Sequence, residues 1–454
     1  MISSISPTDG RVLAEYEETS EAEVRQHIET AAVLQREWEH TSLGERAEPM
    51  LRMADLLEAN REELAALMAD EMGKPLAQGR GEVDKCAWAC RHYAENAERI
   101  LADVHIEADR AKSYVAYRPL GVVLAVMPWN FPLWQVFRFI APALMGGNGG
   151  LLKHASNVTG SALWIDRLVV EAGFPDGLFR TLVLPSSRVD EVLEHPAVVA
   201  ATLTGSDPAG RAVAAKAGSL LKKTVLELGG SDPYIVLADA DLEHAAETCA
   251  TARLINGGQS CISAKRFIVE EPVVDRFTEL LAAALSKAVV GDPHDPATTV
   301  GPMARVDLRD DLHDQVERSV QAGARLVLGG EIPDLPGAFY PPTVLAGVTK
   351  GMAAYHEETF GPVAAVIAAA DLDDAVRIAN DTEFGLGAGI FTSDLELGEK
   401  VARERLQAGA AFVNAFVASD PRLPFGGIKM SGYGRELSDI GMREFLNAKT
   451  VVVA

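Results

Sequence analysis

The chain has 454 residues, of which 48% are hydrophobic and 24% are charged. These are ordinary values for a globular protein of two or three domains. The formal net charge of −23, without any cluster of basic residues, excludes a typical nucleic-acid-binding protein.

The N-terminal and the most apolar segments predict neither export nor membrane insertion. Residues 1–24 lack the apolar core of a secretory signal peptide. The most apolar stretch, residues 121–147, is interrupted by Asn130, Arg138 and three prolines, which argues against a membrane span. We therefore predict a cytoplasmic protein with no membrane or nucleic-acid partner.

The first hundred residues predict helices. Ser20 and Glu23 have the spacing of a capping box in front of an amphipathic segment. Ser42 and Glu45 have the same spacing in front of a longer helical region that runs to Met72. We expect a helix to begin at each of these two boxes.

From Gly121 onward, short β-branched runs alternate with amphipathic helical segments, and a second such series follows a helical segment at residues 241–256. Alternation of this kind predicts parallel strands with helices on both faces, which is an α/β fold. Residues 113–120 alternate like a hairpin strand. The terminal run, residues 446–454, predicts a single strand that needs a sheet to join.

A cluster of glycines, "GGNGG" from Gly146 to Gly150, invites comparison with a phosphate-binding loop. It follows a helical segment and precedes a strand, whereas the dinucleotide-binding fingerprint needs the strand first and the helix after. We expect a helix C-terminal cap and a tight turn at this cluster.

The cysteines and histidines predict no metal site. Cys86 and Cys90 are four residues apart in a helical pattern, without the CxxC spacing of a zinc or redox pair, and are expected in the core. None of the ten histidines belongs to an HExxH-type set. Cys261 is different, because "NGGQSCISAKR" surrounds it with small and polar residues in a loop between a helix and a strand. Taken alone, such a loop cysteine is more often a bystander than a nucleophile.

Five segments occur in an order that resembles the signature set of the aldehyde dehydrogenase superfamily. They are "MPWNFP", "VLELGGSDP", "GGQSCIS", "EETFGPV" and "PFGGIKMSGYGRE", between residues 127 and 436. The resemblance implies a Rossmann-type cofactor domain (residues 1–100 and 120–229) and a second α/β catalytic domain (residues 230–430). It also implies a small β oligomerisation element (residues 101–119 and 437–454), and therefore a homodimer or homotetramer.

The resemblance assigns three catalytic residues. A carbonyl carbon must become tetrahedral before it can release a hydride, and attack by a thiolate achieves this. Cys261 is similar to the family nucleophile, which forms a thiohemiacetal and then a thioester. Asn130 is similar to the side-chain donor for the oxyanion, and Glu227 to the general base that hydrolyses the thioester.

The resemblance also implies a nicotinamide cofactor site. Lys153 is similar to the lysine that binds the adenosine ribose, Glu358 to the residue that binds the nicotinamide ribose, and Phe360 packs near the ring. The complete set is Trp129, Asn130, Lys153, His154, Ala155, Ser156, Gly205, Ser206, Leu228, Glu358 and Phe360. Many NAD-preferring members have Glu where this chain has Ser156, which favours NADP, with NAD as the weaker alternative.

Within the family the sequence is most similar to the short bacterial succinate-semialdehyde dehydrogenases. Arg138, Trp134, Ser419 and Phe425 are expected to line the aldehyde tunnel, with Arg138 and Ser419 binding a substrate carboxylate. Their plainer alternatives are packing roles and an ion pair.

Three other functions stay open at this point. They are a broad-specificity aldehyde dehydrogenase, a CoA-acylating member in which CoA replaces water, and a non-catalytic binding or structural relative. Glu227 argues against the CoA-acylating member, since such members often lack a base there. The joint presence of Cys261, Glu227 and Asn130 argues against a non-catalytic protein.

Overall fold

The computed structural model describes all 454 residues. The chain begins with two strands, although helices were expected for the first hundred residues. Strands β1 (Ile2–Ile5) and β2 (Val12–Tyr16) form an antiparallel hairpin. Their sequences, ISSI and VLAEY, do not alternate apolar and polar residues and therefore give no strand signal. Four helices follow: α1 (Glu21–Trp38), α2 (Leu43–Ala59), α3 (Arg61–Met72) and α4 (Leu76–Leu101). Both expected capping boxes are present, at Ser20 and Ser42.

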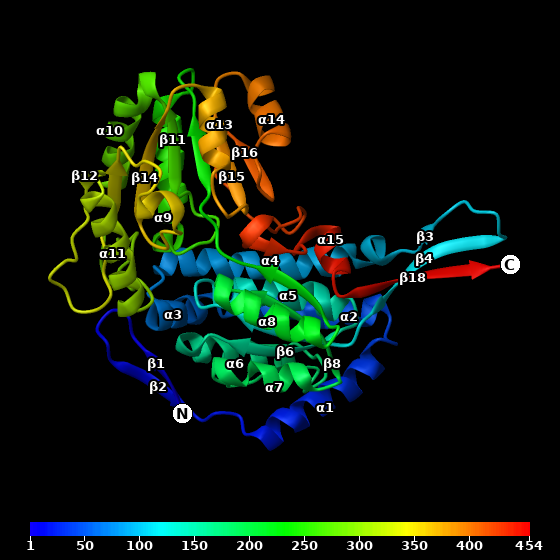
Figure 1. Cartoon of the computed structure of the whole chain (residues 1–454). Helices are drawn as coiled ribbons and strands as arrows, with labels where there is room; N and C mark the ends of the chain where they lie inside the picture. Colours follow the sequence, from blue (N-terminus) through cyan, green and yellow to red (C-terminus); the bar gives the residue numbers. More distant parts are fainter.

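A six-stranded sheet with the strand order β17-β9-β8-β5-β6-β7 forms the lower layer of the molecule (Figure 1). Its parallel strands are β5 (Val122–Met127), β6 (Gly149–His154), β7 (Phe179–Thr181), β8 (Val198–Thr204) and β9 (Lys223–Glu227). The short strand β17 (Gly432–Tyr433) returns from the C-terminal region and pairs with β9 in the antiparallel sense. The helices between these strands are α5 (Trp134–Met145), α6 (Thr159–Glu171), α7 (Val189–Glu194) and α8 (Asp207–Ser219).

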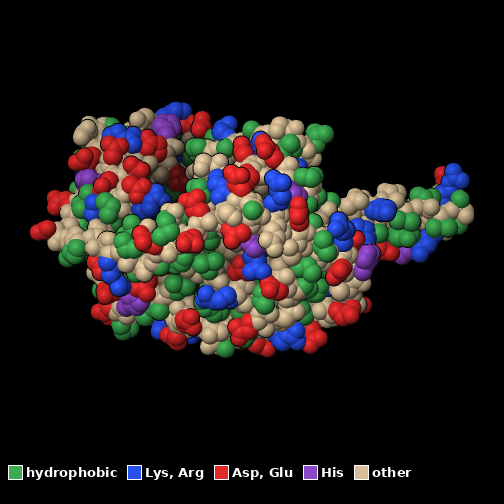
Figure 2. Space-filling view, turned by 90° about the horizontal axis from the view of Figure 1, so that it is seen from below, with side chains coloured by type: hydrophobic (Ala, Val, Ile, Leu, Met, Phe, Trp, Pro, Cys, Tyr) green, Lys and Arg blue, Asp and Glu red, His purple; other side chains and the backbone are tan.

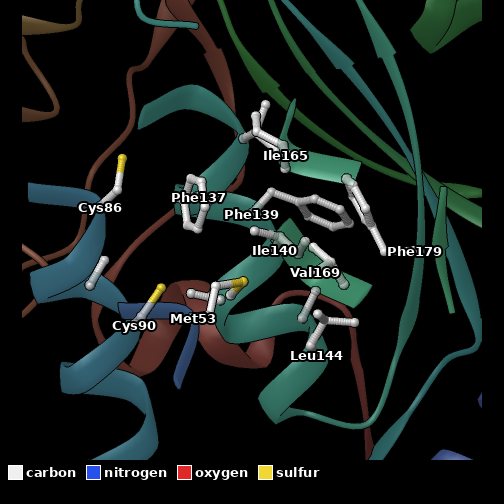
Figure 3. Close-up of a cluster of buried hydrophobic side chains, with 14 of the residues drawn as sticks. Met53, Cys86, Cys90, Phe137, Phe139, Ile140, Leu144, Ile165, Val169 and Phe179 are labelled. Atoms are coloured by element: carbon white, nitrogen blue, oxygen red, sulfur yellow. The ribbon is translucent and has the colours of Figure 1, made fainter. Parts of the chain in front are cut away.

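Successive side chains along the strands of this sheet pack into two separate hydrophobic cores, one on each face, as expected for a sheet covered on both faces. Val123 and Ala125 of β5 pack with helices α2 to α6, whereas Leu124 packs with α1, α7 and α8. Cys86 and Cys90 of α4 belong to the first core (Figure 3) and are fully buried, which confirms their expected packing role. The expected cap and turn after α5 are confirmed too, because α5 ends at Met145 with Gly146 as its C-cap residue, and β6 begins at Gly149.

A seven-stranded sheet with the order β12-β13-β14-β11-β10-β15-β16 forms the upper layer (Figure 1). Its parallel strands are β10 (Pro233–Val236), β11 (Arg266–Glu270), β13 (Thr343–Ala346), β14 (Val363–Ala369), β15 (Gly387–Phe391) and β16 (Ala410–Val413), and β12 (Arg325–Leu328) is antiparallel. Helices α9 (Leu242–Leu254) and α10 (Val274–Leu285) cover one face. The other face is covered by α11 (Val306–Gln321), α12 (Ala353–His356), α13 (Leu372–Asn380) and α14 (Leu395–Glu404). The α/β fold expected from the alternating pattern is confirmed.

A β arm projects from the body (Figures 1 and 2). It consists of β3 (Val104–His105), β4 (Lys112–Pro119) and β18 (Leu446–Val453), and α15 (Ser438–Arg443) leads into β18. The terminal strand pairs with β4 of its own chain over its whole length. The outer edge of β18 has no partner strand in the chain and is open to a further strand. None of the helices is both long and apolar enough to cross a membrane.

The carboxyl ends of the lower-sheet strands lie beside the segment that leads into strand β11 of the upper sheet. Strands β5, β6, β8 and β9 are parallel, so their carboxyl ends, which include Met127, His154 and Glu227, share one edge of the lower sheet. Open α/β sheets bind ligands at this edge. Asn256 to Arg266, the segment with Cys261, leads from α9 into β11 of the upper sheet and faces the same region.

Candidate active site

Cys261 lines a cavity of about 610 Å³ between the two layers. The four residues expected around the aldehyde, Trp134, Arg138, Ser419 and Phe425, line this same cavity. They come from α5 and from the loop after β16, so the fold collects them from two regions that are far apart in sequence. The lining of this cavity therefore combines a thiol with a guanidinium and a hydroxyl.

The backbone around Cys261 explains the small residues that precede it. Asn256 (φ +54°), Gly257 (φ +61°) and Gly258 (φ +78°) occupy the left-handed region, where glycine has no steric cost. A Cβ at Gly258 would collide with the carbonyl oxygen of Gly361. The glycines thus let the chain make the sharp turn that presents Cys261 to the cavity.

The Cys261 thiol is half-buried and its surroundings contain two cations. Burial raises its pKa to about 12, an effect that the positive charges of Arg138 and Lys265 oppose. The Lys265 ammonium donates hydrogen bonds to the carbonyl oxygens of Ser260 (3.0 Å) and Cys261 (2.7 Å) and fixes the loop. The resting thiol is therefore protonated, and its use as a nucleophile requires a base.

Asn130 lies beside the Cys261 loop and is nearly fully buried. Its side-chain NH₂ donates to the carbonyl oxygen of Gln259 at 3.1 Å, which leaves one N–H hydrogen for another acceptor. The Asn130 carbonyl oxygen accepts from Lys74 (3.0 Å) and from the side chain of Asn256 (2.7 Å). These contacts hold the asparagine against the loop that carries the thiol.

A buried ion pair between Lys74 and the α4 residue Glu82 supports the loop that contains Asn130. The Lys74 ammonium contacts the Glu82 carboxylate, and both side chains are at most 2% exposed. Glu82 also accepts the backbone N–H groups of Leu133 (2.8 Å) and Trp134 (2.9 Å) at the beginning of α5. Glu82 thereby satisfies N–H groups that the first turn of a helix leaves unpaired, and it anchors the start of α5.

Glu227 occupies the end of β9 but does not line the Cys261 cavity. Both of its carboxylate oxygens are buried without a hydrogen-bond partner. Burial and the negative charge of Glu436 raise its pKa well above the usual value, whereas Arg138 lowers it. A Cβ at Gly426 would meet the Glu227 carboxylate, so this glycine leaves room for it. The result is a carboxylate with raised basicity that is free of competing contacts.

Arg138 is 2% exposed and already has an anionic partner. Its guanidinium forms an ion pair with Glu436 at 2.8 Å, donates to Thr204 at 3.3 Å, and lies 4.6 Å from the centre of the Phe425 ring. Glu436 comes from the last of the five motifs. The ion pair that was the plainer alternative for Arg138 is thus present, although Arg138 also lines the cavity.

A second cavity, of about 910 Å³, lies at the carboxyl edge of the lower sheet. The expected cofactor residues that line it are Trp129, Lys153, Ala155, Ser156, Gly205 and Ser206. Ser206 is the N-cap residue of α8, but its side chain makes no capping hydrogen bond, so the hydroxyl is available to a ligand. A hydroxyl at a helix N-terminus suits a phosphate group.

The charges around this second cavity favour an anion. The Lys153 ammonium has only a weak contact, 3.3 Å to the Ser186 hydroxyl. The two carboxylates of the lining are each held by an arginine: Asp9 contacts Arg11 at 3.3 Å, and Asp307 contacts Arg305 at 2.7 Å. Lys153 is therefore the one cation of the lining that no carboxylate neutralises, which fits a phosphate-bearing cofactor.

Besides His154, four expected cofactor residues lie outside the lining of the second cavity. The Glu358 carboxylate accepts from the backbone N–H of Gly230 (3.0 Å) and lies 3.3 Å from Lys265. Phe360 packs edge-on against Trp129 with ring centres 5.7 Å apart, and Leu228 is buried against α8. Asn130, the fourth, belongs to the Cys261 loop described above.

His154 makes contacts that sequence reasoning did not foresee. Burial lowers the pKa of its imidazole to about 4, so the ring is neutral. Its Nε2 donates to the Pro132 carbonyl oxygen at 2.8 Å, and its Nδ1 accepts from the Ala155 backbone N–H at 2.9 Å. The imidazole is hydrogen-bonded to Pro132 of the "PWNFP" loop and does not line the second cavity.

Two cations at these cavities were missed by sequence reasoning. Lys85 of α4 lines the Cys261 cavity, and Arg305 lines the second cavity. Neither belongs to any of the five motifs. Lys85 contacts Ser419, which is 334 positions along the chain, whereas Arg305 pairs with Asp307, two positions away. No sequence signal identified them.

Comparison with known proteins identifies the family of the chain. Residues 1–451 match the aldehyde dehydrogenase family, and the chain belongs to that family. The resemblance carried by the five motifs is thereby confirmed.

Individual members of the family with high similarity to this chain are named for particular aldehydes. The NADP(+) succinate-semialdehyde dehydrogenase of Mycobacterium avium is 51% identical over 454 residues, covering 99% of this chain and 96% of that protein. The crystal structure of succinic semialdehyde dehydrogenase from Streptococcus pyogenes in complex with NADP+ is 39% identical, with a TM-score of 0.98 and complete coverage of both chains. An indole-3-acetaldehyde dehydrogenase from P. syringae is 34% identical with a TM-score of 0.95, covering 99% of this chain and 93% of that one. The fold is thus shared by enzymes named for quite different aldehydes.

Proposed function

We propose that this protein oxidises succinate semialdehyde to succinate with NADP(+). The observation that carries the proposal is the Cys261 cavity, which places a thiol in the same enclosed space as two cationic side chains and a hydroxyl. A short aldehyde with a carboxylate at its far end offers a carbonyl carbon to the thiol and a negative charge to the cations of this lining. The M. avium and S. pyogenes relatives, named for the same substrate, support the choice.

The first half of the reaction is assigned to Cys261 and Asn130. Once a base has taken the proton of the Cys261 thiol, the thiolate adds to the aldehyde carbon, forming a C–S bond while the carbonyl electrons move to oxygen. The second N–H of Asn130 and the backbone N–H of Cys261 bind that oxyanion, and loss of one such donor typically costs ~10²–10³ in rate. The hydride then leaves the same carbon, and a bound NADP(+) would supply the acceptor for it. The C=O bond then re-forms as a thioester on Cys261.

The second half is assigned to Glu227. Its carboxylate has no partner to give up when it turns toward the cavity. Its raised basicity suits removal of a proton from the water that attacks the thioester carbon. The C–S bond breaks, succinate leaves, and the thiol is restored.

Lys153, Ser156 and Ser206 are proposed to hold the cofactor phosphates. We expect Ser156→Glu to lower the ratio of kcat/KM for NADP(+) to kcat/KM for NAD(+) by about 30-fold or more, since a carboxylate facing the 2′-phosphate costs about 2 kcal/mol or more. Steady-state kinetics with both cofactors measures this ratio. Ser156→Ala is the matched control, which removes the hydroxyl without adding charge and should change the ratio only a few-fold. An unchanged ratio in Ser156→Glu would place the 2′-phosphate elsewhere.

The proposed substrate is tested with the unaltered protein. Initial rates of reduced-cofactor formation are compared for succinate semialdehyde and butanal, which has the same four-carbon chain without the carboxylate, in the absence of CoA. We expect kcat/KM to be at least about 100-fold higher for succinate semialdehyde, because a charge-assisted contact in an enclosed site contributes about 2–5 kcal/mol. Equal values would indicate a broad-specificity enzyme, and a strict need for CoA would indicate an acylating one.

We also propose a cytoplasmic homodimer or homotetramer that assembles through the β arm. Four apolar residues of the arm are exposed, namely Val104, Ile106, Val452 and Val453, and the outer edge of β18 is open. An unpaired strand edge with exposed apolar side chains is typical of a surface that a second subunit covers. On the face shown in Figure 2, acidic and basic side chains are mixed over the body, and green apolar side chains recur along the arm.

A further inference from the structure

Glu71, near the end of α3, is a buried carboxylate that lines neither of the two cavities. It is 1% exposed, and it accepts hydrogen bonds from the backbone N–H groups of Gly160 (2.7 Å) and Ser161 (3.0 Å) and from the Ser161 hydroxyl (2.7 Å). Burial raises the pKa of Glu71 to about 7, and these donors oppose the rise because they stabilise the ionised form. The main partners of this carboxylate therefore all belong to the beginning of α6.

The beginning of α6 has no cap of its own. Val158 is its N-cap residue and has no side-chain acceptor for the N–H groups that the first turn of a helix leaves unpaired. Glu71 supplies that acceptor from α3, and a negative charge at a helix N-terminus is also favoured by the helix dipole. A Cβ at Gly160 would lie 2.7 Å from the Glu71 carboxylate, so the missing side chain at this position permits the close approach.

The first turn of α6 continues directly from the second cavity. Ser156 and Asn157, which line that cavity, belong to a short 3₁₀ turn, η1 (Ser156–Val158), that immediately precedes α6. The Asn157 carbonyl oxygen accepts a 2.9 Å hydrogen bond from the Ser4 hydroxyl of β1, which also lies 3.4 Å from the Glu71 carboxylate. The turn is thus fixed from two sides, by a carboxylate of α3 and by a hydroxyl of the N-terminal hairpin.

The place of this turn matters because Ser156 is proposed to face the 2′-phosphate of the cofactor. A hydrogen bond weakens steeply when donor and acceptor move apart, and a misplacement of about 1 Å in a binding group can cost a large factor in function. The beginning of α6 is already filled by the protein's own carboxylate. The beginning of α8, in contrast, leaves the Ser206 hydroxyl open to a ligand.

We propose that Glu71 is a positioning residue of the cofactor site, which holds the turn at Ser156 in the place where its side chain selects between NADP(+) and NAD(+). Ser4 supports the same turn from the hairpin. This inference rests on the proposed cofactor site and adds to it a residue that touches no cofactor. Its effect should therefore depend on the side chain at position 156, whereas a residue that only stabilises the fold would act independently of that side chain.

The first test is binding of NADP(+) and of NAD(+) to Glu71→Gln without aldehyde, measured by calorimetry at about pH 8, above the pKa of Glu71. A carboxamide has one acceptor oxygen, so one of the two N–H groups of α6 loses its partner. We expect the ratio of Kd for NAD(+) to Kd for NADP(+) to fall by about fivefold or more. Hydrogen exchange of the cofactor-free protein should become faster at Gly160 and Ser161. Ser4→Ala, a milder change, should lower the ratio by about twofold to threefold.

Asp166→Asn is the matched control. Asp166 is another buried carboxylate of the same layer and lies on α6 itself, where it accepts from the Thr181 backbone N–H (2.8 Å) and from Arg180 (3.1 Å). We expect this change to lower Tm and to leave the ratio of the two Kd values within about twofold. An equal fall of the ratio in Asp166→Asn would show that general loosening of α6 is sufficient, which would overturn the inference.

Ser156→Glu, made alone and together with Glu71→Gln, separates positioning from stability. We expect Ser156→Glu to lower the ratio by about 30-fold in the otherwise unaltered protein, but only by about fivefold or less when Glu71→Gln has released the turn. An effect of the same size in both backgrounds, or an unchanged ratio in Glu71→Gln alone, would overturn the inference. A Ser156→Glu protein with the ratio of the unaltered protein would instead overturn the proposed cofactor site.

Discussion

Cys261→Ala should lower aldehyde oxidation by at least about 10⁴-fold, because no hydride can leave the aldehyde carbon until a nucleophile has made it tetrahedral. The change removes one sulfur atom from a half-buried side chain at the cavity wall and should leave the second cavity unaltered. The measurement is reduced-cofactor formation with saturating succinate semialdehyde and NADP(+). Cofactor binding, followed by quenching of tryptophan fluorescence, should stay within about threefold.

Cys249→Ala is the matched control for this experiment. Cys249 is a fully buried cysteine of α9 in the core of the upper layer, and burial raises its thiol pKa far above the usual value. We expect its replacement to affect stability more than activity. Substantial turnover by Cys261→Ala would remove Cys261 as the nucleophile.

Glu227→Gln should separate the two halves of the reaction. The amide keeps the shape of the side chain but cannot take a proton from water, so the thioester should form and then persist. We expect a rapid burst of about one reduced cofactor per active site, followed by a steady rate at least about 100-fold below that of the unaltered protein. Stopped-flow absorbance measures both phases.

Hydroxylamine supplies the control for Glu227→Gln, because it attacks a thioester without a general base. Its addition should restore a large part of the steady rate. A normal steady rate without hydroxylamine would show that Glu227 is not the base. Loss of the burst would show that Glu227 acts before hydride transfer.

Local features of this fold were predictable from sequence. The capping boxes at Ser20 and Ser42 and the glycine cap after α5 depend on residues within a few positions of one another, and all three are present. The β1–β2 hairpin was missed because neither of its strands alternates apolar and polar residues. The pairing of β18 with β4 was missed because it joins segments more than 300 positions apart, which no local pattern encodes.

The residues around the Cys261 cavity also divide into those that local sequence motifs identify and those that only the folded structure brings together. Cys261, Asn130 and Glu227 lie in motifs whose order identified the family, so they could be named before the fold was known. Lys85 and its partner Ser419 are 334 positions apart, and the ion pair between Arg138 and Glu436 joins residues almost as distant. Folding alone brings such residues together. The contacts of Lys85 and Arg138 could therefore be found only from the tertiary structure.

The covalent state of Cys261 during turnover tests the account most directly. Glu227→Gln is mixed with succinate semialdehyde and NADP(+), quenched in acid after the burst, digested, and examined by mass spectrometry. We expect the peptide that contains Cys261 to gain about 100 Da, the mass of a succinyl thioester, in proportion to the burst. The gain should be absent without NADP(+) and reversed by hydroxylamine. A burst with Cys261 unmodified, or with the acyl group on another residue, would contradict the proposed mechanism.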